Sequence, residues 1–425
     1  MTFLIGILFL LGFIAVGIPI GFALGLAGIA SLSLVVPPHL ILSLLSQVAH
    51  ETAASYVMVT IPMFVLMAEF LSCGGIAQDL LIACNRLMRR LRGGMALATV
   101  LAGAVLASAS GSSTASAASM TRAAYPVMRE AGYASSFAIG TISVAGTLAI
   151  MIPPSVAFIL YGLMTETSIG KLFVAGVVPG ILTALGYALT IAITLRLRPD
   201  LGPKPELEAK LSTRAGKGRV WPVGVLIAIV VGCLYTGIAT PTEISALGAL
   251  GALVIALGTR RIDRTNFGHA VGNTIRTTTM IITIIFSAHM FGYFISFTKI
   301  TDAMLAWIAN SGTSATTVML IVVLIYLALG MIMDQAAIII LTSPITAPLM
   351  VGLGYDPIWW GVIIIKTAEI GLVSPPMGLN VFVTSAAAKS DLRSGFFGVL
   401  PFIATEFLIL AALLAFPALS LALVW

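Results

Sequence analysis

Long apolar runs, separated by short polar or charged stretches, extend along the whole chain. As helices, runs such as 134–163 and 171–195 are long enough to cross about 30 Å of hydrocarbon. Of the 425 residues, 59% are hydrophobic and only 9% are charged, a composition that excludes a soluble globular protein. The apolar start, residues 3–34, is too long for a signal peptide and lacks a basic leader. The pattern therefore predicts an all-α polytopic membrane protein.

Two of the apolar runs are interrupted by adjacent prolines, at 146–155 (GTLAIMIPPS) and at 367–380 (TAEIGLVSPPMGLN). A proline removes one backbone donor, and its ring clashes with the carbonyl one turn earlier. Within a membrane, the freed carbonyls are tolerated only where protein or a polar cavity satisfies them. Secondary transporters use such broken helices to bind ions and anionic substrates. We therefore expect a transporter with two broken transmembrane helices, at about 134–163 and 357–388.

The chain contains an internal repeat with an offset of 222 residues. Five prolines of the first half recur at this offset, where roughly 0.4 coincidences are expected by chance. The pairs are Pro19 and Pro241, Pro126 and Pro348, Pro153 and Pro375, Pro154 and Pro376, and Pro179 and Pro401. The duplicated architecture of secondary transporters has this form. We expect a first repeat over 1–197, a linker over 198–218 and a second repeat over 219–425.

The distribution of basic residues predicts that the two repeats are inverted. The net charge is +6, but the basic residues cluster in loops, so they indicate membrane orientation and not nucleic-acid binding. The linker region 196–219 holds seven basic residues and is expected in the cytoplasm, with Arg260, Arg261 and Arg264 on the same side. Counting crossings then places both ends of 94–129 in the cytoplasm and both ends of 313–352 in the periplasm. The number of crossings within 1–53 stays open.

These two returning segments are predicted to be re-entrant hairpins. The tip of the first is a run of serines and other small residues at 108–116, and hydroxyl groups there suit a buried polar tip better than lipid. Two full crossings, or a helix-packing surface of small residues, are the alternatives. The second tip, 330–335, contains Asp334 at a depth where carboxylates are usually functional. The alternative for Asp334 is a helix cap.

Six motifs together give the chain a specific resemblance to the large membrane subunit (DctM type) of tripartite ATP-independent periplasmic (TRAP) transporters. They are RLRGG at 90–94, SGSS at 110–113, IPPS at 152–155, TPTE at 240–243, GMIMD at 330–334 and EIGLVSPPMGLNVFV at 369–383. The resemblance covers essentially the full length. It implies a sodium-coupled elevator in the bacterial inner membrane, in which two hairpins and two broken helices slide against a scaffold. It also implies a small four-helix DctQ-type subunit, expected as a separate chain, and a DctP-type periplasmic binding protein that delivers the substrate.

The resemblance also assigns site residues, with Na⁺ as coupling ion and no organic cofactor. The first sodium site would use Ser110, Ala149, Ile152 and Pro154, and the second Gly330, Gly371, Ser374 and Met377. An organic acid of the carboxylate class would bind between the tips, near Ser113, Thr114, Ser155, Asp334 and Asn380.

The chain departs from the family pattern at three positions: Ser116 replaces an aspartate, Ala149 replaces a glycine, and Lys366 precedes Glu369 by three residues. The alanine suggests a more restricted first sodium site. Lys366 and Glu369 are expected either to neutralise each other or to act near the substrate.

Two other function classes are considered. One is an ion-coupled carboxylate carrier or antiporter that needs no binding protein, and the other is a membrane enzyme or redox subunit. The sequence has no GxxxxGK[ST] motif, so ATP is not expected to drive transport, and no catalytic triad or zinc motif points to an enzyme.

Overall fold

The computed structural model describes residues 2–203, 221–259 and 262–424, and within them every secondary-structure element is a helix. The first half contains α1 (Thr2–Ala15), α2 (Ile20–Leu32), α3 (Pro38–Ala54), η1 (Tyr56–Val59), α4 (Thr60–Cys73), α5 (Ile76–Met88), α6 (Gly94–Ser110), α7 (Ser113–Glu130), α8 (Ser135–Met151), α9 (Val156–Thr165), α10 (Ile169–Leu197) and η2 (Pro199–Leu201). The second half contains α12 (Trp221–Thr236), α13 (Pro241–Gly258), α14 (Arg264–Thr298), α15 (Ile300–Ser311), α16 (Ala315–Gly330), α17 (Gln335–Gly352), α18 (Pro357–Gly371), α19 (Leu379–Ala387), α20 (Leu392–Ala415) and α21 (Ala418–Leu421).

The two halves repeat the same order of helices. Adding 222 to the bounds of α7 (113 and 130) gives 335 and 352, the bounds of α17. Packing partners repeat as well: α2 packs on α14 as α13 packs on α4, and α7 packs on α19 as α17 packs on α9. One difference is that α3, η1 and α4 together correspond to the single helix α14.

Both proline pairs interrupt their helices. The chain leaves helical geometry between α8, which ends at Met151, and α9, which begins at Val156. The second interruption separates α18, which ends at Gly371, from α19, which begins at Leu379. Because Pro154 and Pro376 lack N–H groups, the carbonyls four residues earlier need other donors. Ser155 Oγ donates to Ile150 O at 2.5 Å, and the Asn380 backbone N–H donates to Leu372 O at 3.0 Å.

Membrane character follows from helix length and burial. Within the described part of the chain, seven helices or helix pairs are long and apolar enough to cross a bilayer. The span formed by α8 and α9 is the most buried of them, at 89% of its apolar window, whereas only 33% of α20 is buried. The interrupted first helix therefore lies inside the protein, where neighbours can satisfy its backbone. These features confirm the all-helical, membrane-type class.

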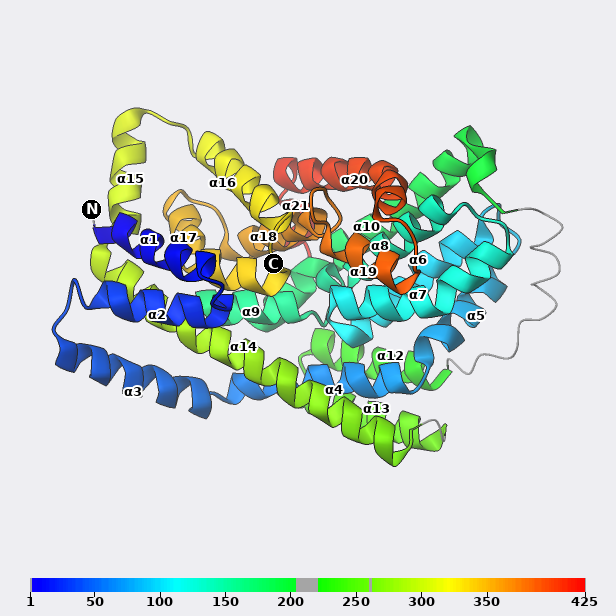
Figure 1. Ribbon diagram of the computed structural model, residues 1–425, viewed down its shortest axis with the longest axis horizontal. Helices are drawn as coiled ribbons and strands as arrows, with labels where there is room; N and C mark the ends of the chain where they lie inside the picture. The colour runs from blue at the N-terminus through cyan, green and yellow to red at the C-terminus, as the bar shows by residue number, and fades with distance from the viewer. Residues whose placement is uncertain (1, 204–220, 260–261, 425) are drawn as a thin grey trace.

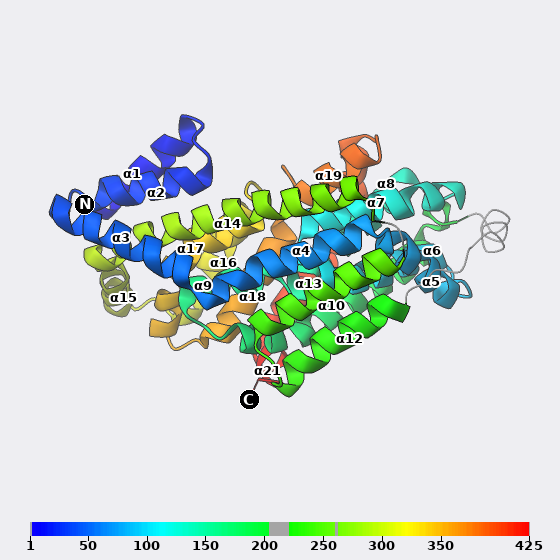
Figure 2. The same cartoon turned by 90° about the horizontal axis from the view of Figure 1, so that it is seen from below.

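The two predicted hairpins occupy different ends of the molecule. Figure 1 shows α6 and α7 together on the right, towards the grey trace, and α16 and α17 together on the left. Figure 2 shows the long helix α14 running beside α4 across the length of the molecule. The inversion of the two repeats stays a prediction. The predicted linker lies outside the described residues from residue 204 onward, as do Arg260 and Arg261.

Candidate transport site

The second hairpin tip lies directly against the second helix break. A Cβ atom on Gly371 would lie 2.4 Å from both the Cα and the carbonyl carbon of Gly330. Real Cβ atoms do not approach backbone so closely, so only glycine fits at position 371. Gly371 is not among the residues with positive φ, so dihedral freedom does not explain a glycine at this position. The reason for this glycine is the close approach of two backbones.

Two further predicted sodium ligands lie in the same break. Ser374 is buried, and its hydroxyl donates to Ile370 O at 2.7 Å, while its oxygen accepts no hydrogen bond from any other described residue. Met377, in contrast, is 53% exposed. Gly330, Gly371 and Ser374 thus come from two segments of the chain and meet in one region.

The first hairpin tip meets the first helix break in a similar way. A Cβ atom on Gly111 would lie 3.4 Å from the backbone nitrogen of Val156 and 3.6 Å from the carbonyl oxygen of Pro154. Gly111 has a positive φ of 58°, which explains a glycine at this turn. The structure therefore places Pro154 beside the first tip. Of Ser110, only the backbone is described, so the predicted role of its hydroxyl stays a prediction.

Ala149 and Ile152 lie at the end of α8. Ala149 is fully buried within regular helix, so its backbone conformation is one that alanine adopts freely. The expectation that alanine restricts the backbone here is therefore wrong. Because Pro153 has no N–H, the carbonyl of Ala149 loses its usual helical donor. Ile152 is extended, with φ −82° and ψ 120°, and it is the first residue outside the helix.

The predicted substrate residues fall into two groups. Asn380 and Ser113, separated by 267 positions, meet in a fully buried contact of 2.5 Å between Asn380 Nδ2 and Ser113 Oγ. Asn380 Nδ2 also donates to Ser143 O at 3.3 Å, and the Asn380 Oδ1 atom has no hydrogen-bond partner among the described residues. Ser155 lies in the first break and is buried, and its hydroxyl donates to Ile150 O. Thr114 is partly exposed, one residue beyond Ser113.

Asp334 is the N-cap residue of α17. Its side-chain Oδ2 accepts from the Ala336 backbone N–H at 3.1 Å, and the residue remains exposed. Capping satisfies one of the free donors at the start of the second hairpin arm. The alternative of a helix cap is therefore confirmed, and among the described residues no hydrogen bond joins Asp334 to Asn380 or Ser113.

A known family matches almost the whole chain. The family model of the tripartite ATP-independent periplasmic transporter, DctM component, matches residues 7–419. The chain belongs to the DctM family. A DctM relative from Pseudomonas aeruginosa, a C4-dicarboxylate TRAP transporter large permease protein, is 36% identical, covering 94% of this chain and 93% of that protein. An isethionate TRAP transporter permease protein, DctMQ, from Oleidesulfovibrio alaskensis is 32% identical, covering 96% of this chain and 64% of that protein.

The DctM fold also resembles a solved transporter structure. The Alcanivorax borkumensis YdaH transporter aligns with a TM-score of 0.62 over 88% of this chain and 89% of that chain. Sequence identity is only 14%, so this likeness concerns the fold alone.

One charged cluster of this DctM protein lies wholly within the protein. Lys366 Nζ lies 3.0 Å from Glu369 Oε2 and 2.5 Å from Glu406 Oε2, with all three side chains fully buried. Lys366 also donates to Thr183 Oγ1 at 2.8 Å, and Tyr187 donates to the other oxygen of Glu406. The expectation that Lys366 and Glu369 pair is confirmed.

Sequence reasoning missed Glu406, the third charge of this cluster. The signal was present, because Glu406 is a lone carboxylate in the apolar run of α20, and such residues are costly in a membrane unless paired. Ser143, whose carbonyl contacts Asn380, carried no comparable signal.

Proposed function

We propose that this DctM component carries out sodium-coupled secondary uptake of a small organic acid across the bacterial inner membrane. Membership of the family supports its role as the large permease of a TRAP system. The observation that carries the proposal is the meeting of each hairpin tip with a helix break: Gly330 with Gly371, and Gly111 with Pro154. At each contact lie backbone carbonyl oxygens that lack their usual hydrogen-bond donor within the helix.

Such contacts suit a monovalent hard cation. Sodium prefers oxygen ligands, and carbonyl and hydroxyl oxygens supply them without adding fixed charge. At the second contact, the residues are Gly330, Gly371 and Ser374. At the first, they are Ala149 and Pro154. Because each contact joins a hairpin to a broken helix, a bound ion would hold the tip closed over the site.

The substrate is proposed to bind beside Asn380 and Ser113. The unpartnered Oδ1 of Asn380 shows that this buried polar group has unused hydrogen-bonding capacity. The half-helices α9 and α19 both begin at the breaks, and helix N-termini favour anions. The relatives from P. aeruginosa and O. alaskensis are named for dianionic and anionic organic acids. We favour the carboxylate class.

The proposed mechanism is an elevator. The bundle that contains α6–α10 and α16–α20 would move as a unit against a scaffold that contains α2, α4, α13 and α14, which pack mainly on each other. A DctP-type periplasmic protein would deliver the acid, and a DctQ-type small subunit would brace the scaffold. The name of the DctMQ relative joins two such components in one chain.

Reconstituted transport tests the proposal. Proteoliposomes would contain this chain, its small subunit and, outside, the periplasmic binding protein loaded with a radiolabelled C4-dicarboxylate. We expect accumulation under an inward sodium gradient, and none when potassium replaces sodium or when the binding protein is omitted. Equal uptake in potassium would contradict sodium coupling. Equal uptake without the binding protein would instead support a self-sufficient carrier.

A further inference from the structure

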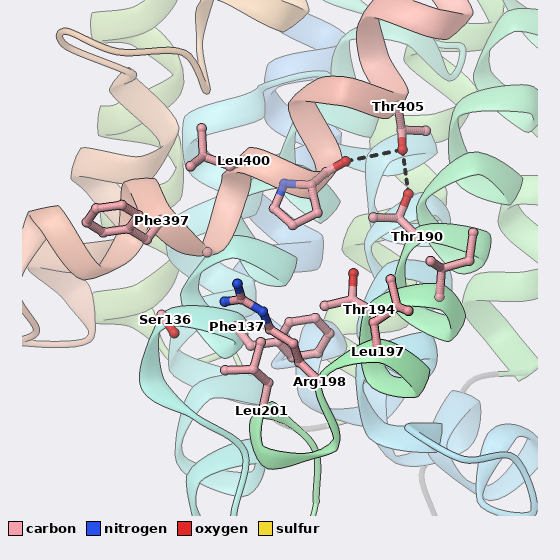
Figure 3. A pocket seen from close by; sticks show the side chains of 13 residues that line it. Ser136, Phe137, Thr190, Thr194, Leu197, Arg198, Leu201, Phe397, Leu400 and Thr405 are labelled. Atoms are coloured by element: carbon pink, nitrogen blue, oxygen red, sulfur yellow. Dashed lines mark hydrogen bonds between the residues drawn. The ribbon is translucent and has the colours of Figure 1, made fainter.

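A cavity of about 610 Å³ lies between α10 and α20, away from the residues of the candidate transport site. Most of its lining is apolar, with a few hydroxyls and one cation. Figure 3 shows these side chains and the open space that they surround. The lining includes Ser136, Thr194, Leu197, Arg198, Phe397 and Leu400.

Among the described residues that line the cavity, Arg198 alone carries a charge. Figure 3 shows its guanidinium directed into the cavity, between Ser136 and the end of α10. Among the described residues, this guanidinium makes no hydrogen bond or ion pair, whereas the hydroxyls of Thr190 and Thr405 bond each other at 2.5 Å. The cavity therefore offers an unused, fork-shaped cationic donor that suits a phosphate group.

The apolar part of the cavity continues onto the outer surface of α10. Five exposed apolar residues follow at intervals of four: Ile181, Leu185, Leu189, Ile193 and Leu197, which are 48–77% exposed. Positions four apart lie on one face of a helix, so these side chains form a continuous stripe about 24 Å long. On the opposite wall, Phe397 is 60% and Leu400 49% exposed. The stripe has the length and character of a surface that contacts acyl chains.

The depth of Arg198 agrees with a lipid headgroup. It caps the C-terminal end of α10, one residue beyond the last apolar position of the stripe and at the start of the basic region predicted to be cytoplasmic. Anionic lipids are enriched in the cytoplasmic leaflet, and basic pockets between transmembrane helices bind their headgroups.

We infer that the α10–α20 cavity is a binding site for one anionic phospholipid. Its phosphate is held by the Arg198 guanidinium, with the Ser136 and Thr194 hydroxyls beside it, and an acyl chain lies in the apolar cavity and along the α10 stripe. The site is independent of sodium and of the transported acid.

Native mass spectrometry of the full chain, purified with its small subunit in mild detergent, tests this inference. The protein is incubated with phosphatidylglycerol or with phosphatidylcholine of the same acyl chains. We expect one phosphatidylglycerol to be retained and phosphatidylcholine to be lost. In Arg198→Gln, retention of phosphatidylglycerol should fall about tenfold, because the charge-assisted bidentate contact is removed. Thr194→Trp, which fills the apolar cavity, should also reduce retention.

Arg196→Gln is the matched control, because Arg196 is an exposed arginine on the same turn that does not line the cavity. It should retain the lipid as the wild type does. Equal losses in Arg196→Gln and Arg198→Gln, or equal retention of the two lipids, would overturn the inference. Glycerol 3-phosphate, which lacks acyl chains, should not raise the thermal unfolding midpoint, whereas phosphatidylglycerol should do so in the wild type but not in Arg198→Gln. A shift with glycerol 3-phosphate alone would also contradict it.

Discussion

The two helix breaks follow one plan but differ in how tightly the hairpin tip approaches them. At the second break, Gly330 and Gly371 bring two backbones into direct contact. Their counterparts at the first break, 222 residues earlier, are Ser108 and Ala149, which both carry a Cβ. The first break is short and buried, whereas Pro375, Pro376 and Met377 are exposed at the second. Both halves therefore share the helix break, but the hairpin tip packs against it differently in each half.

The breaks also differ in charge. The second is preceded by the buried Lys366 and Glu369, while the equivalent positions of the first half are Val144 and Thr147. Among the described residues, the charged side chains at 0% exposure are Lys366, Glu369 and Glu406, all from the second half. Glu406 of α20 joins them, so the cluster ties α18 to α20 and, through Thr183 and Tyr187, to α10.

The largest effect is expected from breaking this cluster. Lys366→Met leaves two carboxylates buried without their ammonium partner, which costs about 3–5 kcal/mol for a buried pair. The thermal unfolding midpoint and the folded yield of the purified protein should both fall sharply. The triple variant Lys366→Met, Glu369→Gln, Glu406→Gln has no net charge in the cluster and should recover much of the loss. If Lys366→Met were as stable as the wild type, the cluster would not stabilise the fold.

Gly371→Ala tests the close backbone contact. The added methyl group would meet Gly330 backbone at 2.4 Å, and overpacking of this kind costs about 1–3 kcal/mol. Because the tip must move away, we expect sodium-driven uptake per folded protein to fall about tenfold or more. Ala149→Gly, the matching change in the first half, should alter uptake by less than about twofold, since helix propensity changes by only about 1 kcal/mol. Equal effects of the two changes would remove the contrast between the breaks.

Asn380→Ala separates substrate binding from ion binding. The counterpart of Asn380 in the first half is Phe158, so the second half alone supplies this amide. Loss of one buried hydrogen-bonding group costs about 1–3 kcal/mol, so the substrate concentration for half-maximal uptake should rise about tenfold. The sodium dependence should change much less. A shift in sodium dependence alone would place Asn380 in an ion site.

Ser374→Ala should have the smallest effect. The hydroxyl is one ligand of several, and its own donor bond to Ile370 O is local to the helix end. The sodium concentration for half-maximal uptake should rise about fivefold, with the substrate dependence unchanged, because a net hydrogen bond contributes about 1 kcal/mol. Uptake measured against sodium concentration at saturating substrate checks this, and an unchanged curve excludes the hydroxyl as a ligand.

Much of the architecture can be predicted from the sequence because local chemistry determines it. Apolar runs predict helices, and Pro153–Pro154 and Pro375–Pro376 interrupt them wherever they fold. The requirement for glycine at 371 could not be predicted in the same way, because it depends on Gly330, 41 residues away in sequence. The pairing of Glu406 with Lys366, and of Asn380 with Ser113, likewise depends on helices that meet only in the folded bundle.

Direct measurement of ²²Na⁺ binding to the purified protein tests the central claim that ions bind where hairpin tips meet helix breaks. A scintillation proximity assay would compare the wild type with Gly371→Ala and Ala149→Gly, each normalised to folded protein. We predict saturable binding in the wild type and in Ala149→Gly, with a weakened or lost component in Gly371→Ala. Superimposable binding curves for all three proteins would contradict the account.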